Sequence, residues 1–504
     1  MTSEHVDVLI VGAGISGIGA AAQLGMKLPD KAYLVLESRQ ASGGTWDLFR
    51  YPGIRSDSDM FTFGYKWHPW PSDQSLADGH MILDYLRTIA KEYGVEDKIR
   101  YGHKVTKADW DSDAQQWTVV AATDEGEKTF TANFLWSCSG YYDYDEGHQP
   151  VFPGVEDFEG TFIHPQFWPE DLDYGGKKVV VIGSGATAVT LVPAMADQVE
   201  HITMLQRTPT YVFSRPGRDP LAKGLGAALG LVPRFVPFKG LREKAGFEAI
   251  RWANIGVLVG SYKLARRRPK LVKKVIRDGV IEHLTARPGQ PGLTKEEAIR
   301  YADEHFNPPY NPWDQRLCAV PDGDLFRAIR HGKASVVTDK IKRIVADGIE
   351  LESGKKLDAD IIISATGLKV RFFGGVEVHV DGKPVRVQDT MAYKGVLLSG
   401  VPNLAFTVGY TNASWTLKVD LVCEYVTNLL AEMAAHGYTE VVVERDPSVA
   451  ASPFMDMEAG YLLRAQELMP RKGDRGPWQV RQSYLYDMKV LSADIRDSKE
   501  LQFS

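Results

Sequence analysis

The stretch VDVLIVGAGISG, residues 6–17, decides the fold class of this 504-residue chain. Its near-continuous apolar run, Val6–Val11, is typical of a parallel strand that is buried on both faces. The run leads into a glycine-rich turn and then into IGAAAQLG, whose small residues favour a closely packed helix. Twenty residues beyond Gly17, the next apolar run, YLVLE, ends in Glu37. This spacing predicts an α/β, doubly wound (Rossmann-like) domain that binds a dinucleotide.

Each residue of this turn has a physical role. Gly12 allows the sharp turn, Gly14 lets the backbone approach a pyrophosphate, and Gly17 permits close packing of the helix on the strand. The helix N-terminus, with Ser16 in its first turn, offers N–H donors and a positive dipole end to the phosphates. We expect the Glu37 carboxylate to accept hydrogen bonds from ribose hydroxyls.

A second unit of the same kind begins about 170 residues later. The apolar strand Lys178–Ile182 ends in another glycine-rich turn, followed by the helical run VTLVPAMA. The strand HITMLQR then ends in Arg207, where the first unit has an acid. A guanidinium can pair with a 2′-phosphate that a carboxylate would repel, so this unit favours NADP(H) over NAD(H). The residues that we expect to hold its phosphates are Gly183, Ser184, Gly185, Ala186, Thr187 and Ala188.

Two dinucleotide sites, one acid-terminated and one arginine-terminated, indicate FAD and NADPH as cofactors. Disulfide reductases need a redox cysteine pair beside the flavin, but Cys138, Cys318 and Cys423 lie far apart and form no CxxC pair. That class is therefore excluded. The same cysteine usage gives no disulfide framework and predicts a reducing, cytoplasmic location. We expect no metal site.

Composition excludes other classes of protein. The chain has 59 Lys and Arg against 65 Asp and Glu, a net charge of −6, and so no global basic field for nucleic acid. The longest uncharged stretch, Gly395–Leu417, is long enough to span a bilayer, but it contains Pro402 and Asn403 and is typical of strands and turns. We expect neither a membrane span nor a signal peptide, because the first residues lead directly into a strand.

The order of the motifs along the chain predicts two domains and an insertion. We expect a first dinucleotide-binding domain from residues 1–150 and 385–504, a second from 151–216 and 317–384, and a helical insertion at 217–316. Asp360–Gly367 is typical of the return strand of the second domain. Within the insertion, a basic cluster over Arg266–Lys274 is most simply a solvated helix face, and a membrane-surface or partner-binding patch remains the alternative.

Two longer patterns resemble those of the Baeyer–Villiger monooxygenases. Phe158, Gly160, His164 and Trp168 match FxGxxxHxxxW(P/D), and residues 43–57 match (A/G)GxWxxxx(F/Y)P(G/M)xxxD. The order of the motifs matches too, so the resemblance covers essentially the whole chain. Stretches such as NPWDQRLC and VGYTNASWTLK are similar to mycobacterial, ethionamide-activating members of the family.

This resemblance implies an activity. NADPH would reduce FAD, and O2 would form a C4a-peroxyflavin that attacks a ketone to give an ester or lactone, or oxygenates a sulfide or thioamide. Two alternatives stay open: a flavin-dependent N- or S-oxygenase without ester-forming chemistry, and a non-catalytic flavin/NADP redox-sensing module. The natural substrate and the oligomeric state do not follow from the sequence.

The resemblance also assigns roles to residues. Arg316 matches an active-site arginine that lies over the flavin and stabilises negative charge, and Asp57 matches the acid that contacts it. His164 matches a linker between domains that couples domain rotation to the reaction, although by sequence alone a structural histidine is the favoured interpretation. Because Gln315 stands where many members have a lysine, the preference for NADPH rests more heavily on Arg207. The remaining implied cofactor contacts are Gly44, Thr45 and Trp46 to the flavin, Val105 to adenine, Arg55 and Ser56 near the nicotinamide, and Val189 and Thr208 at the NADP site.

Overall fold

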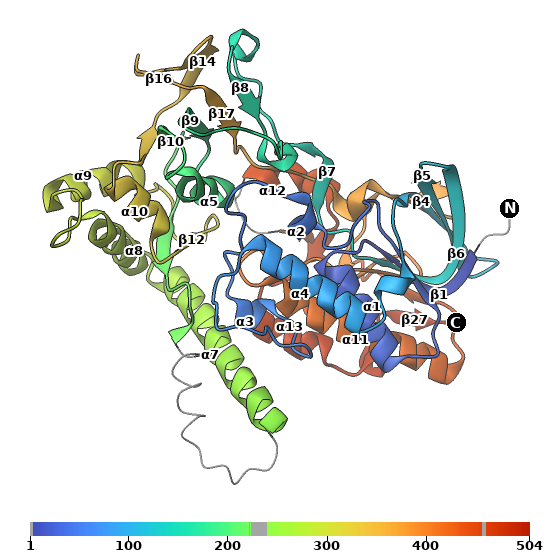
Figure 1. Cartoon of the computed structure of the whole chain (residues 1–504). Coiled ribbons are helices and arrows are strands. Elements are labelled where there is room, and N and C mark those ends of the chain that lie inside the picture. Colours follow the sequence, from blue (N-terminus) through green and yellow to red (C-terminus); the bar gives the residue numbers. More distant parts are fainter. Residues whose placement is uncertain (1–3, 221, 223–238, 456–459) are drawn as a thin grey trace.

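The computed structural model describes residues 4–220, 222, 239–455 and 460–504, which form two α/β bodies and a helical arm (Figure 1). Each glycine-rich turn joins a strand to a helix, as predicted. In the first body β1 (Glu4–Val11) leads into α1 (Ile15–Lys27). In the second, β9 (Lys178–Ile182) leads into α5 (Ala186–Met195).

The first body is built on an eleven-stranded mixed sheet of described residues. Its main path runs β20-β19-β4-β5-β6-β1-β2-β3, and β1 pairs in parallel with β2 (Tyr33–Leu36) on one side and β6 (Gly126–Ser137) on the other. A buried central strand with two parallel neighbours explains the apolar run of β1. The other strands are β3 (Ile99–Arg100), β4 (Lys104–Asp111), β5 (Gln116–Thr123), β19 (Glu377–Val380), β20 (Lys383–Pro384), β21 (Ala392–Tyr393), β22 (Leu397–Leu398) and β23 (Leu404–Phe406).

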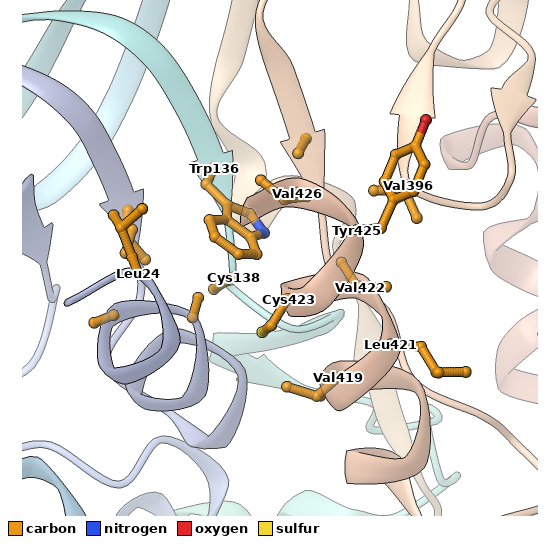
Figure 2. Close-up of a cluster of buried hydrophobic side chains, with 14 of the residues drawn as sticks. Leu24, Trp136, Cys138, Val396, Val419, Leu421, Val422, Cys423, Tyr425 and Val426 are labelled. Atoms are coloured by element: carbon orange, nitrogen blue, oxygen red, sulfur yellow. The ribbon is translucent and has the colours of Figure 1, made fainter. Parts of the chain in front are cut away.

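Helix α11 (Trp415–His436) packs beside α1 to form the main core of this body. Figure 2 shows Trp136 and Cys138 lying between the two helices, with Cys423 of α11 beside them. Each apolar side chain of Val or Leu size that is fully buried here stabilises the fold by about 1.5–3 kcal/mol. Other elements of this body are α2 (Thr45–Leu48), α3 (Met60–Phe63), α4 (Gly79–Glu92), α12 (Gly460–Ala465), α13 (Tyr484–Leu491), β24 (Val441–Val443), β25 (Ala451–Pro453), β26 (Arg471–Gly473) and β27 (Leu501–Phe503).

The second body has a five-stranded parallel sheet in the order β13-β10-β9-β17-β8. The predicted return strand is β17 (Ile361–Ser364), which pairs with β9 and brings Ile362 opposite Val180. Helix α10 (Asp324–Arg330) packs against α5. The remaining strands are β8 (Thr161–Ile163), β10 (His201–Gln206), β13 (Ala334–Thr338) and the small antiparallel sheet β14 (Ile341–Val345), β15 (Gly348–Leu351) and β16 (Lys356–Asp358).

The chain crosses between the bodies on two paired strands. β7 (Tyr142–Gly147) leaves the first body, and β18 (Leu368–Val370) returns antiparallel to it. Residues 377–384, which we expected in the second body, instead join the first sheet: β19 pairs in parallel with β4, and β20 pairs with β19. These strands cover the edge of β4, which would otherwise present unpaired backbone groups.

The insertion is helical, as predicted, over α7 (Lys239–Arg267), α8 (Pro269–Leu284) and α9 (Lys295–His305). It lies between β11 (Val212–Arg215) and β12 (Cys318–Pro321). Pro269 ends the first helix and begins the second, because proline is tolerated only in the first turn. Residues 221 and 223–238 of the expected insertion lie outside the described residues. Throughout the described chain, every helix is too short or too polar to cross a bilayer.

Candidate active site

A cavity of about 490 Å³ lies where the two bodies meet. It is lined by the first turns of both α1 and α5, so the N-termini of two helices from different bodies reach one space. Such helix ends attract anionic groups. Of the residues predicted from the sequence, this cavity is lined by Gly12, Gly14, Ser16, Glu37, Gly44, Thr45, Trp46, Arg55, Ser56, Asp57, Val105, Ala186, Thr187 and Arg316.

The first glycine turn fits a pyrophosphate. Gly12 has φ +102°, and a Cβ there would lie 2.8 Å from the carbonyl oxygen of Cys138. A Cβ on Gly17 would collide with the backbone of Gly12, so both positions require glycine. No described side chain caps the N-terminus of α1, which leaves its first N–H groups available to a ligand. The backbone itself thus forms the phosphate cradle that the sequence predicts.

Glu37 follows β2 at the cavity wall and is almost fully buried. Its Oε2 accepts from the backbone N–H of Ala13 at 2.7 Å, and its Oε1 accepts from that of Arg39 at 2.9 Å. Desolvation by burial raises the pKa of this carboxyl, and the two backbone donors oppose the shift. The Ser38 hydroxyl also donates to Oε1, at 3.3 Å, so Oε2 keeps a lone pair for a further donor, which fits a ribose hydroxyl.

Arg316 and Asp57 meet in the cavity although 259 positions separate them in sequence. Nη2 of Arg316 donates to Oδ1 of Asp57 at 2.9 Å. The Asp57 carboxylate raises the pKa of Arg316, so this guanidinium remains positive. About a third of the arginine side chain stays exposed toward the cavity. The pair therefore presents a fixed cation to any ligand there.

The side chains of the neighbouring residues Arg55 and Ser56 do not join the Arg316–Asp57 pair but bond to other partners. Nη1 of Arg55 donates to Oδ2 of Asp324, the first residue of α10, at 2.5 Å. The side chains of this pair are only 11% and 15% exposed. The buried Ser56 hydroxyl donates to the backbone oxygen of Ser58 at 3.0 Å. Arg55 therefore connects the two bodies at the cavity wall.

The second glycine turn contributes less to the cavity wall than the first. Ala186 and Thr187 line the cavity, and no described side chain caps α5. The hydroxyl of Ser184 lies 2.7 Å from that of Thr210, and Arg207 is exposed just beyond β10. The expected residues that lie outside the cavity wall are Gly17, Gly183, Ser184, Gly185, Ala188, Val189, Arg207 and Thr208.

The residues Phe158, Gly160, His164 and Trp168 also lie away from the cavity wall. Nε2 of His164 lies 3.3 Å from the backbone oxygen of Gly367, just before β18, and its Nδ1 accepts from the N–H of Gln166 at 3.2 Å. Burial lowers the pKa of His164, so the neutral ring suits this bonding. His164 thus ties the segment after β8 to a strand that crosses between the bodies.

Several cavity residues were not predicted individually. Nε1 of Trp415, at the start of α11, donates to Oγ of Ser16 at 2.8 Å. The phenol of Tyr410 donates to Asp487 at 2.7 Å. Both aromatic residues lie in VGYTNASWTLK, a stretch noted above only for its resemblance. No local motif identifies the further lining residues Tyr141, Tyr142 and Arg371.

Comparison with known proteins identifies relatives along the whole chain. The family model described as flavin-binding monooxygenase-like matches residues 53–238, and a model of an NAD(P)-binding Rossmann-like domain matches residues 10–77. The chain is 50% identical over 504 residues to the FAD-containing monooxygenase EthA of Mycobacterium tuberculosis, covering 100% of this chain and 98% of that protein. It is 46% identical over 492 residues to a probable FAD-binding monooxygenase, AlmA, of an Acinetobacter species, covering 97% and 94%.

Solved structures share the fold at lower identity. An oxidized steroid monooxygenase bound to NADP aligns over 99% of both chains with a TM-score of 0.74 and 19% identity. An open crystal structure of cyclohexanone monooxygenase aligns over 100% of both chains with a TM-score of 0.73 and 19% identity. These likenesses establish the two-body α/β architecture, and the full-length identity to EthA establishes the kinship. The chain belongs to the family of FAD-containing monooxygenases.

Proposed function

We propose that this protein is an NADPH-dependent Baeyer–Villiger monooxygenase that converts ketones to esters or lactones and also oxygenates organosulfur compounds. One oxygen atom of O2 enters the bond between the carbonyl carbon and its neighbour, the other leaves as water, and NADPH supplies two electrons. Bound FAD would supply the activation of O2. The observation that carries the proposal is the Arg316 guanidinium, held by Asp57 in the cavity that the two helix N-termini share.

The chain's own groups fit this chemistry. The turn around Gly12 and the uncapped end of α1 would hold the FAD pyrophosphate, and Glu37 its ribose. The α5 end would hold NADP, with Arg207 facing the 2′-phosphate. Arg316 would donate to the substrate carbonyl oxygen as that oxygen gains negative charge. Asp57 keeps the guanidinium charged and fixes its direction.

Replacing Arg316 tests the proposal. With FAD-loaded protein, NADPH and a panel of ketones and sulfides, we expect Arg316→Ala to lower ketone turnover by about 10²-fold or more, the loss typical of removing a charge-stabilising donor. Arg316→Lys keeps the charge without the planar fork and is expected to recover only part of the activity. The matched control is Arg343→Ala, an exposed residue of β14.

Three outcomes would contradict the proposal. Undiminished ketone oxidation by Arg316→Ala would remove Arg316 from the mechanism. Sulfide oxygenation by the unaltered protein without any ester or lactone, measured by mass spectrometry, would make the protein an S-oxygenase. NADPH oxidation that responds to no organic compound would favour a redox-sensing module.

A further inference from the structure

The outward face of α7 and α8 exposes an unusual set of large apolar side chains. In α7 the exposed fractions are 45% for Trp252, 62% for Val257 and 46% for Leu264. In α8 Leu271 and Val275 are at least half exposed. Single apolar residues are ordinary on a protein surface, but five exposed ones within 24 consecutive positions of two successive helices require an explanation. Figure 1 shows α7 running along one side of the molecule.

Of these residues of α7, Trp252 also lies beside Tyr484 of α13, with 6.3 Å between the ring centroids, whereas Val257 and Leu264 lie away from the packed side of the helix. Its inward contacts are made by Arg251, Asn254, Ile255 and Ala265, which are buried. On the other side, Gly256 and Gly260 have open space where a Cβ would stand. Positions 253, 256, 257, 260 and 264 recur at helical spacing, so the open side is a continuous apolar stripe.

Positive charge lies at the C-terminal end of this stripe and along the start of α8. We define the cation set as Lys263, Arg267, Arg268, Lys270 and Lys274, all exposed. None of the five forms an ion pair with a described residue, whereas the nearby Arg266 pairs with Asp314, and Arg277 with Asp303. Free cations gathered here, in a chain of net charge −6, form a local field opposite in sign to that of the whole protein.

We propose that the outward face of α7 and α8 binds the surface of an anionic lipid bilayer. Apolar side chains interleaved with lysine and arginine are the combination that inserts between acyl chains while pairing with negatively charged headgroups. A second copy of this chain is a poorer occupant, because a symmetric contact would bring like charges together. An acidic protein would satisfy the cations without requiring the exposed apolar stripe. Lipid satisfies both.

Vesicle binding by the full-length, FAD-loaded protein tests this proposal. We expect it to float with vesicles of phosphatidylcholine and phosphatidylglycerol in equal parts, but not with phosphatidylcholine alone, and to dissociate as salt is raised. Lys270→Gln with Lys274→Gln should weaken binding by about tenfold or more, and so should Leu264→Ser with Val275→Ser. Lys91→Gln with Lys98→Gln is the matched charge control, since both lysines are exposed on the first body, and Val151→Ser is the apolar control.

A site-specific probe gives a second readout. All three native cysteines are buried, so a single Leu264→Cys or Val275→Cys can be labelled selectively with an environment-sensitive dye. We expect the dye to shift toward apolar emission on anionic vesicles, and the same dye on Val151→Cys to stay unchanged. Failure of the unaltered protein to bind anionic vesicles at low salt would overturn the proposal, as would equal losses in the control variants. Dimerisation that depends on Leu264 and Val275, without vesicle binding, would assign the face to a second copy instead.

Discussion

Glu37 and Arg207 illustrate how single residues distinguish the two nucleotide sites. Each follows the second strand of its unit: Glu37 after β2, and Arg207 after β10. The acid is buried and held by two backbone N–H groups, whereas the arginine is exposed and has no ion-pair partner among the described residues. A buried acceptor suits a neutral ribose, and a free guanidinium suits a doubly charged phosphate.

We therefore expect Arg207→Ala to raise the KM for NADPH by about ten- to a hundredfold, the loss typical of hydrogen bonds to a charged group. The KM for NADH, which lacks the phosphate, should change little, and steady-state kinetics with both nucleotides measures the difference. Arg343→Ala serves as the control. Equal losses with both nucleotides would contradict a role in phosphate recognition.

At the residue scale, sequence reasoning succeeds where function follows a local pattern. The turn at Gly12 and the position of Glu37 were both predicted from spacing, because backbone geometry alone requires them. The contact between Arg316 and Asp57 came only from resemblance to a family, since no spacing rule brings together residues 259 positions apart. Trp415 and Tyr410 reach the cavity through packing of α11 and its preceding loop, which no local motif encodes.

At the element scale, a buried arginine bonds α7 to the first body, beside apolar contacts such as that of Phe247 with Phe61. Arg251, only 2% exposed, donates to the backbone oxygens of Phe61 and Gly64 and to Oδ2 of Asp420 in α11 at 3.1 Å. Burial raises the pKa of Asp420 to about 6, while the charge of Arg251 acts to lower it. Helix α7 is thereby linked to α3 and α11, the elements that stand behind the cavity.

Removing Arg251 should therefore destabilise the protein in a pH-dependent manner. A carboxyl whose pKa is higher in the folded than in the unfolded state weakens folding as pH rises from about 4 to about 6. Without Arg251 the pKa of Asp420 rises further, so Arg251→Met should cost about 3–5 kcal/mol near neutral pH and less near pH 5. Thermal unfolding across this range measures the effect. Adding Asp420→Asn should abolish the pH dependence, and its persistence would show that another group titrates.

At the scale of the whole molecule, the two bodies are joined at the cavity by Arg55 and Asp324. The pair is largely buried, and it bridges a loop of the first body and the start of α10 in the second. We expected Arg55 to lie near the nicotinamide, and that stays a prediction. Its bidentate bonding to Asp324, at 2.5 and 3.4 Å, makes it an anchor between the two bodies at the cavity wall.

A double-mutant cycle with Arg55→Gln and Asp324→Asn should give a coupling free energy of about 0.5–3 kcal/mol for unfolding, as expected of a buried pair in direct contact. The more exposed pair of Arg343 and Glu350, with side chains 56% and 31% exposed and bonded at 2.9 and 3.1 Å on β14 and β15, is the matched control. That pair should give less than about 1 kcal/mol, because water screens it. Equal coupling in the two cycles would contradict an anchoring role for Arg55.

The domain boundaries show the limit of sequence reasoning at this scale. Both parallel cores and the helical insertion follow from apolar periodicity. The placement of β19 and β20 does not, because it depends on an edge of β4 that only the assembled sheet reveals.

The pairing of β7 with β18 has a consequence for protein engineering. The chain leaves for the second body and comes back along adjacent antiparallel strands, with Gly147 opposite Leu368 and Tyr142 opposite Val370. The segment from β8 to β17 therefore enters and leaves the second body at neighbouring points. Exchanging this segment between relatives requires two junctions, one in β7 and one in β18, which lie side by side. The rest of the first body is left unchanged. We therefore expect the choice between NADPH and NADH to move with the exchanged segment.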